Sequence, residues 1–159
     1  MVDQHSALRV KLSDIVEGLE FQADESFSYL HTATGEVVSV TTEELRAAEN
    51  EEPLEDFPEW QHDPIRIAGE ILSTDHYLPL PDRFEIHEYS IMERFCLSVE
   101  DEDIRDDLCN AIRGRGAFRY FKDRIHAYGI TEEWYWYRDA ALREIAMAWC
   151  EAHEIPYME

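Results

Sequence analysis

The stretch AIRGRGAFRYFKDRIHAYG, residues 111–129, is the most informative part of this sequence. Glycines lie near both of its ends, and apolar side chains recur between them at helical spacing. Winding the chain at about 100° per residue gathers those apolar side chains on one face of a helix. They are Phe118, Phe121, Ile125 and Tyr128. The pattern predicts a helix from about Arg115 to Tyr128 that buries an aromatic face.

Positive charge is concentrated in the same stretch. Five of the 14 lysines and arginines of the chain fall within it, and only Asp123 opposes them. They are Arg113, Arg115, Arg119, Lys122 and Arg124. The same winding places Arg115, Arg119 and Lys122 on a stripe beside the aromatic face, whereas Arg124 lies off both.

One interpretation of this stripe is functional. A glycine-rich junction that opens a helix can bind an anion, because free N–H groups and the helix dipole both favour negative charge. Arg115 and Arg119 would add bidentate contacts to phosphate or carboxylate, and Lys122 would add a further charge. Gly114 and Gly116 would shape the approach of the ligand to the backbone.

The other interpretation is structural. The stripe is the only concentrated positive charge in an acidic chain, and it would pair with the acids of residues 100–107 to hold helices together. The glycine spacing is neither a Walker A loop nor a dinucleotide-binding fingerprint, so it is a weak signal of nucleotide binding. Both interpretations stay open at the level of sequence.

The last helix is predicted from Thr131 onward and carries two tryptophans, Trp134 and Trp149, on a wide apolar stripe. Arg138 falls inside that stripe by the helical count. A buried arginine needs a carboxylate partner, because an unpaired buried charge is costly. We therefore expect Arg138 to be a structural staple or a ligand anchor.

The first half of the chain predicts a small sheet among short helices. Residues 26–41 alternate in polarity around Thr34-Gly35, which is typical of a hairpin. Residues about 50–63 are acidic and rich in proline, which predicts an exposed loop. Residues 77–81 predict an edge strand because of their prolines. Helices are predicted over 13–22 (capped by Ser13), 42–50 (capped by Thr41 or Thr42), 63–72 (capped by Asp63), 85–99 and 104–112.

Together these patterns predict an α+β fold that is mostly helical. A small N-terminal sheet would pack against a C-terminal helical bundle, in one domain over residues 1–159. Residues 85–99 should bury Tyr89, Met92 and Cys96 on one face.

Charge and composition narrow the classes of function. The chain has 36 acidic and 14 basic side chains among 159 residues, a net charge of −22, which opposes binding to bulk nucleic acid or to anionic membranes. Three scattered cysteines, no apolar signal core and no membrane-length apolar run lead us to expect a cytoplasmic protein. Neither a metal-ligand spacing nor a catalytic motif appears, so we expect no cofactor and no metal.

The segment at 114–123 resembles a bacterial uncharacterised protein family of the UPF series. Members are similar in carrying a glycine–basic–glycine–Ala–Phe–Arg–x–Phe–Lys–Asp segment, followed by a tryptophan-bearing helix that Trp134 and Trp149 match here. The stretches TGEVV (34–38), YLPLP (77–81) and YSIMERF (89–95) also resemble the family's pattern. The resemblance implies a shared fold and no established activity.

Three hypotheses of function follow. The first is a non-enzymatic binding or adaptor protein that contacts a small anionic ligand or a protein partner through the basic helix 113–126. The second is an acidic decoy that imitates nucleic acid and occupies a basic protein, using the carboxylates of 43–63 and 82–107. The third is an enzyme that acts on a phosphorylated substrate.

Overall fold

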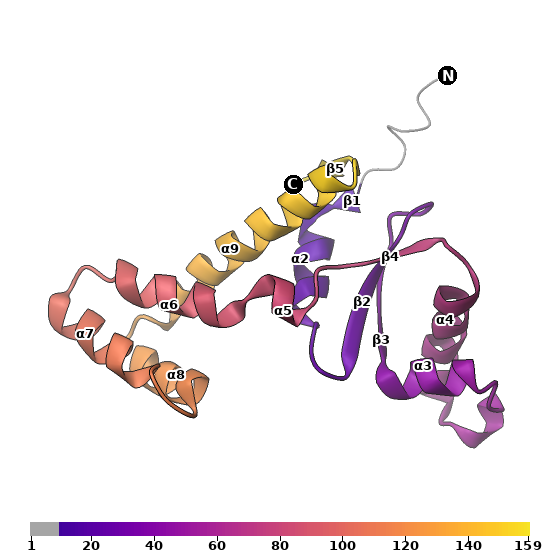
Figure 1. Cartoon of the computed structure of the whole chain (residues 1–159), viewed down its shortest axis with the longest axis horizontal. Coiled ribbons are helices and arrows are strands. Elements are labelled where there is room, and N and C mark those ends of the chain that lie inside the picture. Colours follow the sequence, from indigo (N-terminus) through magenta and orange to yellow (C-terminus); the bar gives the residue numbers. More distant parts are fainter. Residues whose placement is uncertain (1–9) are drawn as a thin grey trace. The chain divides into compact units, whose positions relative to one another are not determined.

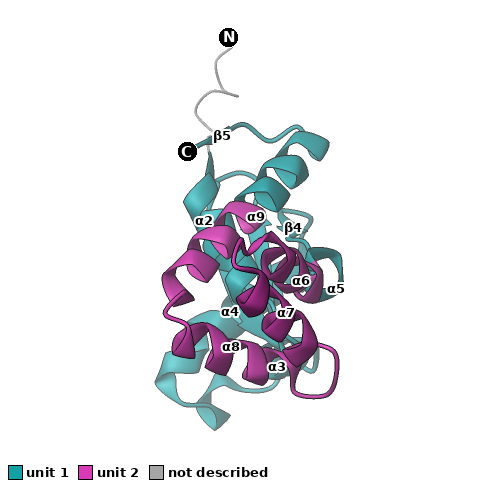
Figure 2. Cartoon of the chain, turned by 90° about the vertical axis from the view of Figure 1, so that its left-hand side faces the viewer, with its two compact units in different colours: residues 1–86, 143–159 teal, residues 87–142 magenta. Residues whose placement is uncertain are grey.

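The computed structural model describes residues 10–159, and the fold is α+β and mostly helical, as predicted. The chain divides into two compact units (Figure 2). Unit 1 combines the described part of residues 1–86 with residues 143–159, and unit 2 is the continuous segment 87–142. The single domain and the packing of sheet on bundle stay predictions. The expectation of no signal core rests mostly on residues before 10, outside the described part.

Unit 1 contains a three-stranded antiparallel sheet with the order β3-β2-β4 (Figure 1). A second pairing joins two short strands, β1 and β5, in parallel. The strands are β1 Val10–Lys11, β2 Ser26–His31, β3 Val37–Thr41, β4 Tyr77–Pro79 and β5 Tyr157–Met158. The helices of this unit are α2 Leu12–Glu20, α3 Thr42–Glu49, α4 His62–Ser73, α5 Arg83–Ile86 and the second part of α9, which spans Thr131–Ala152.

The predicted hairpin and the predicted edge strand are confirmed. Gly35 has a φ of 78°, the left-handed conformation that the turn between β2 and β3 requires. Thr41 caps α3 through a capping box, in which its side chain accepts from the Glu44 N–H and Glu44 accepts from the Thr41 N–H.

Gly18 lets helix α2 pack closely on the sheet. A Cβ at this position would lie 2.7 Å from Leu80 Cδ1 and 2.9 Å from Val37 Cγ1. The Ser28 hydroxyl donates to the Gly18 carbonyl oxygen at 2.8 Å. The glycine that weakens α2 as an isolated helix is therefore the residue that seats the helix on the strands.

Two local predictions in this unit, the caps of helices α2 and α4, are wrong. Helix α2 is preceded by Lys11 without a side-chain cap, so Ser13 lies inside it, and α4 begins at His62, before Asp63. The segment about 50–63 is mostly exposed, as predicted, and it also contains two short 3-10 turns, Leu54–Asp56 and Glu59–Gln61. Gln61 is buried and donates to Glu43 Oε1 at 2.8 Å, which ties the segment to α3.

Unit 2 is helical and is built on α6 (Glu88–Ser98), α7 (Glu102–Ala111), α8 (Ala117–Ala127) and the first part of α9. Aromatic rings meet edge to face in its core. Phe121 lies 5.9 Å from Phe95 and 4.9 Å from Trp134, measured between ring centroids. This geometry adds to the burial of apolar area in holding α6, α8 and α9 together.

The single helix predicted over 85–99 is broken. His87 adopts a left-handed conformation with a φ of 52°, so α5 ends at Ile86 and α6 begins at Glu88. Tyr89 is 43% exposed rather than buried, and its hydroxyl donates to the Ile112 carbonyl at 2.7 Å. Met92 and Cys96 are buried as predicted.

Candidate functional site

Helix α8 begins at Ala117, immediately after Gly116. Gly116 has a φ of 73°, and no side chain caps this end of the helix. The first N–H groups of an α-helix have no partner within the helix, and among residues 10–159 no other acceptor binds those of Ala117, Phe118 and Arg119. A Cβ at Gly114 would touch nothing within 4 Å, so only Gly116 is required by the turn.

Two of the four residues on the predicted aromatic face of α8 are buried. Phe121 and Ile125 are fully enclosed, whereas Phe118 and Tyr128 are 37% and 39% exposed. Phe118 packs edge to face on Tyr89, with ring centroids 6.5 Å apart. The buried face of α8 is therefore narrower than the helical periodicity predicts. Phe118 and Tyr128 lie at its border and are partly exposed.

Four cations lie on the outer side of α8 and its preceding turn, and we call them the basic edge. They are Arg113, Arg115, Arg119 and Lys122. All four are exposed, and within the described part of the chain none of them has a carboxylate within ion-pair distance.

The fifth cation of this stretch, Arg124, is paired. Its Nη1 donates to both carboxylate oxygens of Asp107, at 2.6 and 2.7 Å, and the Tyr128 hydroxyl donates to the same carboxylate at 2.6 Å. Hydrogen bonds from Arg124 and Tyr128 lower the pKa of Asp107, and the same bond to Asp107 raises the pKa of Tyr128. The structural interpretation of the sequence predicts that the basic residues pair with the acids of 100–107. In the structure this pairing is made by Arg124, which lies off the stripe of Arg115, Arg119 and Lys122.

Arg138 on α9 donates from Nε to Glu88 Oε1 on α6 at 2.9 Å, within unit 2. Its side chain is 22% exposed, so it is partly buried. The pairing has the geometry of the expected staple between helices.

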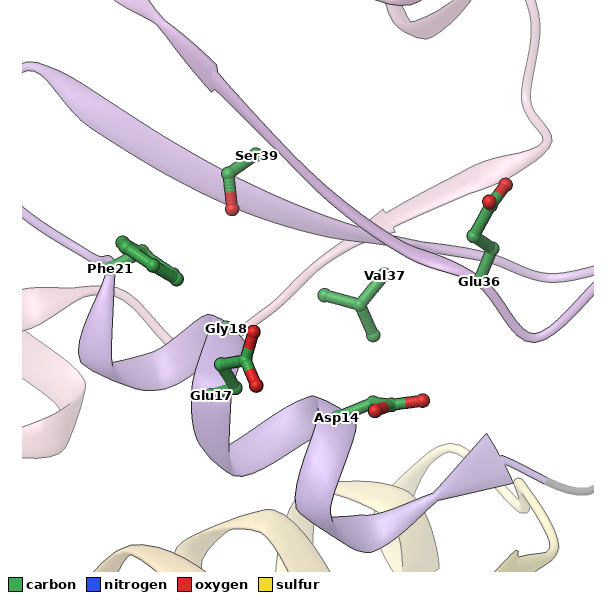
Figure 3. Close-up of a pocket in the computed structure, with 7 residues that line it drawn as sticks. All are labelled: Asp14, Glu17, Gly18, Phe21, Glu36, Val37 and Ser39. Carbon is green, nitrogen blue, oxygen red and sulfur yellow. The ribbon is translucent and has the colours of Figure 1, made fainter.

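A groove in unit 1 was missed by the sequence analysis. It lies between α2 and β3 and has a volume of about 240 Å³ (Figure 3). Its lining residues are Asp14, Glu17, Gly18, Phe21, Glu36, Val37 and Ser39. Asp14 and Glu17 are three residues apart on the exposed side of α2, and that spacing is the one signal in the sequence that could have pointed to it.

Two of the three cysteines are enclosed in the core. All three are free thiols, and Cys96 and Cys150 are buried. Burial raises the pKa of Cys96 to about 12 and that of Cys150 to about 11.

Among residues 10–159 no group of three or more His, Cys, Asp or Glu side chains is placed to hold a metal ion. No helix in the same residues has both the length and the apolar character to cross a bilayer.

Comparison with known proteins gives a family match over almost the whole chain. A family model described as "Uncharacterised protein family (UPF0158)" matches residues 5–158. A UPF0158 protein of Pseudomonas aeruginosa is 33% identical over 66 residues, which cover 41% of this chain and 43% of the relative. The alignment thus spans less than half of either protein. No solved structure matches the chain.

Proposed function

The chain belongs to the uncharacterised protein family UPF0158, and from that premise we propose that it is a non-enzymatic binding or adaptor protein. The basic edge of α8 would contact an anionic group on a small ligand or on a protein partner. The observation that carries the proposal is the exposure of four cations that have no carboxylate partner among residues 10–159, in a chain whose net charge is −22.

Charge balance explains why this observation matters. A cation in a strongly acidic protein has many carboxylates available to it, and Arg124 of this stretch pairs with Asp107. Cations that stay unpaired on one side of a helix keep their capacity for an outside anion. Arg119 and Lys122 lie three residues apart on α8, so one anionic group can reach both side chains.

The start of α8 supports the same proposal. The free N–H groups of Ala117, Phe118 and Arg119 are next to Arg115, and the positive end of the helix dipole adds to the attraction. Gly114 leaves open space at this point, which a ligand would use. The free thiols fit the cytoplasmic location that belongs to this proposal.

The experiment compares two double variants of equal charge. In Arg115→Ala/Arg119→Ala, binding of pyrophosphate or of a poly-glutamate peptide should weaken at least tenfold, because bonds to charged groups are the strong ones. The melting temperature should change by less than about 2 °C, since surface substitutions cost little. Isothermal titration calorimetry and thermal unfolding measure the two quantities.

Arg46→Ala/Arg94→Ala is the matched control, because both arginines are exposed and lie outside the basic edge. It should bind the probes as the unchanged protein does. Equal loss of affinity in both variants would show that the effect comes from net charge and not from the basic edge. A large fall in melting temperature in the first variant would show that its arginines are structural instead.

The decoy and the phosphorylated-substrate enzyme stay alternative hypotheses. Part of the acidic stretch 43–63 serves the fold, because Glu44 is buried in the cap of α3. Binding of a basic protein that is unaffected by salt would contradict the decoy.

A further inference from the structure

We infer that unit 1 carries a second interaction site, at the open edge of β3 beside the groove lined by Asp14, Glu17 and Glu36. Its ligand is an extended peptide segment with lysine or arginine at alternate positions. This inference does not depend on the basic edge of α8, which belongs to unit 2.

The hydrogen-bonding register shows which backbone groups of β3 are unpaired. His31 N–H donates to the Glu36 carbonyl, and Thr42 N–H donates to the Glu25 carbonyl. The direction of the backbone N–H and C=O groups alternates along an antiparallel strand. The N–H and C=O groups of Val37 and Ser39 therefore point away from β2. Within the described residues no partner binds their N–H groups, and such an edge is a template for another strand.

The opposite edge of the sheet is protected. Leu80 N–H donates to the Ser28 carbonyl, and Thr32 N–H donates to the His76 carbonyl, so Tyr77 and Pro79 of β4 face outward. Pro79 has no N–H and cannot pair with an added strand. Strand β3 contains neither proline nor lysine, which are the usual devices against edge pairing.

The groove is lined by Val37 and Ser39 of β3 on one side and by residues of α2 on the other (Figure 3). Val37 points from β3 toward α2, and Glu17 reaches from α2 toward the strand, as the figure shows. Phe21 is 57% exposed and supplies apolar surface at one end. Among residues 10–159 no cation pairs with Asp14, Glu17 or Glu36.

These features select the chemistry of the ligand. Alternate side chains of an added strand lie on one face, about 6.5–7 Å apart, and would project over the groove. Lysine or arginine at those positions can lay its aliphatic stem on Phe21 and Val37 while its charge meets the carboxylates. Main-chain hydrogen bonds to Val37 and Ser39 would supply affinity, and the charges would supply specificity.

Two other occupants fit less well. A bare metal ion lacks a ligand set, because no three of the His, Cys, Asp and Glu side chains in the described residues are suitably grouped. A second copy paired through its own β3 would bring two sets of carboxylates together, and like charges oppose that contact. An extended basic peptide avoids both problems.

The test uses a capped peptide of alternating lysine and valine as the probe. It should bind the full chain saturably in calorimetry at low salt. A peptide of the same composition with its lysines in one block should bind at least about tenfold more weakly, because it cannot pair and match charges together. Methylation of the backbone nitrogens that face β3 should cause a loss of similar size.

Variants of the chain test the same contact from the other side. Asp14→Asn/Glu17→Gln should weaken binding about fivefold, since exposed ion pairs contribute little individually. Glu55→Gln/Glu59→Gln removes the same charge from exposed positions outside the groove and should change nothing. Ser39→Pro removes one outward N–H and should weaken binding while circular dichroism stays unchanged.

Equal binding of the alternating and block peptides would overturn the inference, because charge attraction alone would then suffice. Unchanged affinity in Asp14→Asn/Glu17→Gln, or absence of saturable binding, would overturn it as well. None of these results would alter the binding of pyrophosphate to the basic edge, so the two proposals fail separately.

Discussion

The basic edge of α8 and the groove beside β3 carry opposite charges and are supported in different ways. The basic edge lies on the outer side of one helix, whose inner side is held by Phe121 and Ile125. The groove lies between a helix and a strand that meet at Gly18. Replacing the charges of the basic edge should therefore leave the packing of α8 unchanged, whereas the shape of the groove depends on the close approach of Gly18 to the side chains of Leu80 and Val37.

The largest effect is expected for Phe121→Ala, on the inner side of α8. Phe121 is fully buried against Phe95 and Trp134, so its loss should lower the free energy of unfolding by about 3–5 kcal/mol. Lys122→Ala, the next residue along the helix, should change it by less than about 0.5 kcal/mol. Urea unfolding followed by tryptophan fluorescence compares them, and similar losses would show that the two sides of α8 are not separable.

A smaller effect is expected for Gly18→Val, at the floor of the groove. The added side chain would clash with Leu80 and Val37, so we expect a loss of about 1–3 kcal/mol. Gly69→Ala is the control, because its Cβ would meet only Ala48 Cβ, at 4.0 Å. This helical glycine should gain up to about 1 kcal/mol on substitution. A tolerated valine at position 18 would mean that α2 shifts freely on the sheet.

The smallest effect concerns the one paired cation beside the basic edge, and it depends on pH. The pKa of Asp107 is lowered in the folded chain by Arg124 and Tyr128, so this carboxylate contributes stability above its ordinary pKa of about 3.9. That contribution is lost as the pH falls through the lowered folded pKa. Asp107→Asn should therefore melt below the unchanged protein at pH 7 and converge with it in acid.

Tyr128 affects the alkaline side of the same dependence of stability on pH. Its pKa is raised by its bond to Asp107, so its contribution is present below its ordinary pKa and is lost as the pH rises through the folded value. Melting curves across the pH range measure both the acid and the alkaline side. A difference between the two proteins that is independent of pH would show that the carboxylate acts through packing alone.

Elements with local signals could be predicted from the sequence. The hairpin is marked by alternation and by Gly35, and the cap of α3 by Thr41 and Glu44. The place of Arg119 and Lys122 on one side of α8 follows from helical winding, whereas Arg115, at which the helix was predicted to begin, lies in the turn before Ala117. In each case the residues that decide the structure are neighbours in the chain.

Elements that depend on distant residues could not be predicted. Strands β1 and β5 are two residues each and exist only because Val10 meets Tyr157. The left-handed backbone of His87, with a φ of 52°, is uncommon for residues other than glycine, and no local pattern in the sequence predicts it. The groove joins Glu36 to Asp14 and Glu17 from another element, so no local pattern contains all three.

The pairing of β1 with β5 sets an order of events during synthesis. Unit 2 is one uninterrupted segment, so the helices that pack together in it emerge from the ribosome one after another. Unit 1 needs Tyr157 and Met158 to complete a contact with residues made almost a whole chain earlier. Because translation adds about 5–20 residues per second, several seconds pass between the synthesis of the hairpin and α2 and the pairing of β1 with β5. A nascent chain stalled before residue 157 would thus hold Val10 without its partner, and proteolysis of stalled chains can detect that state.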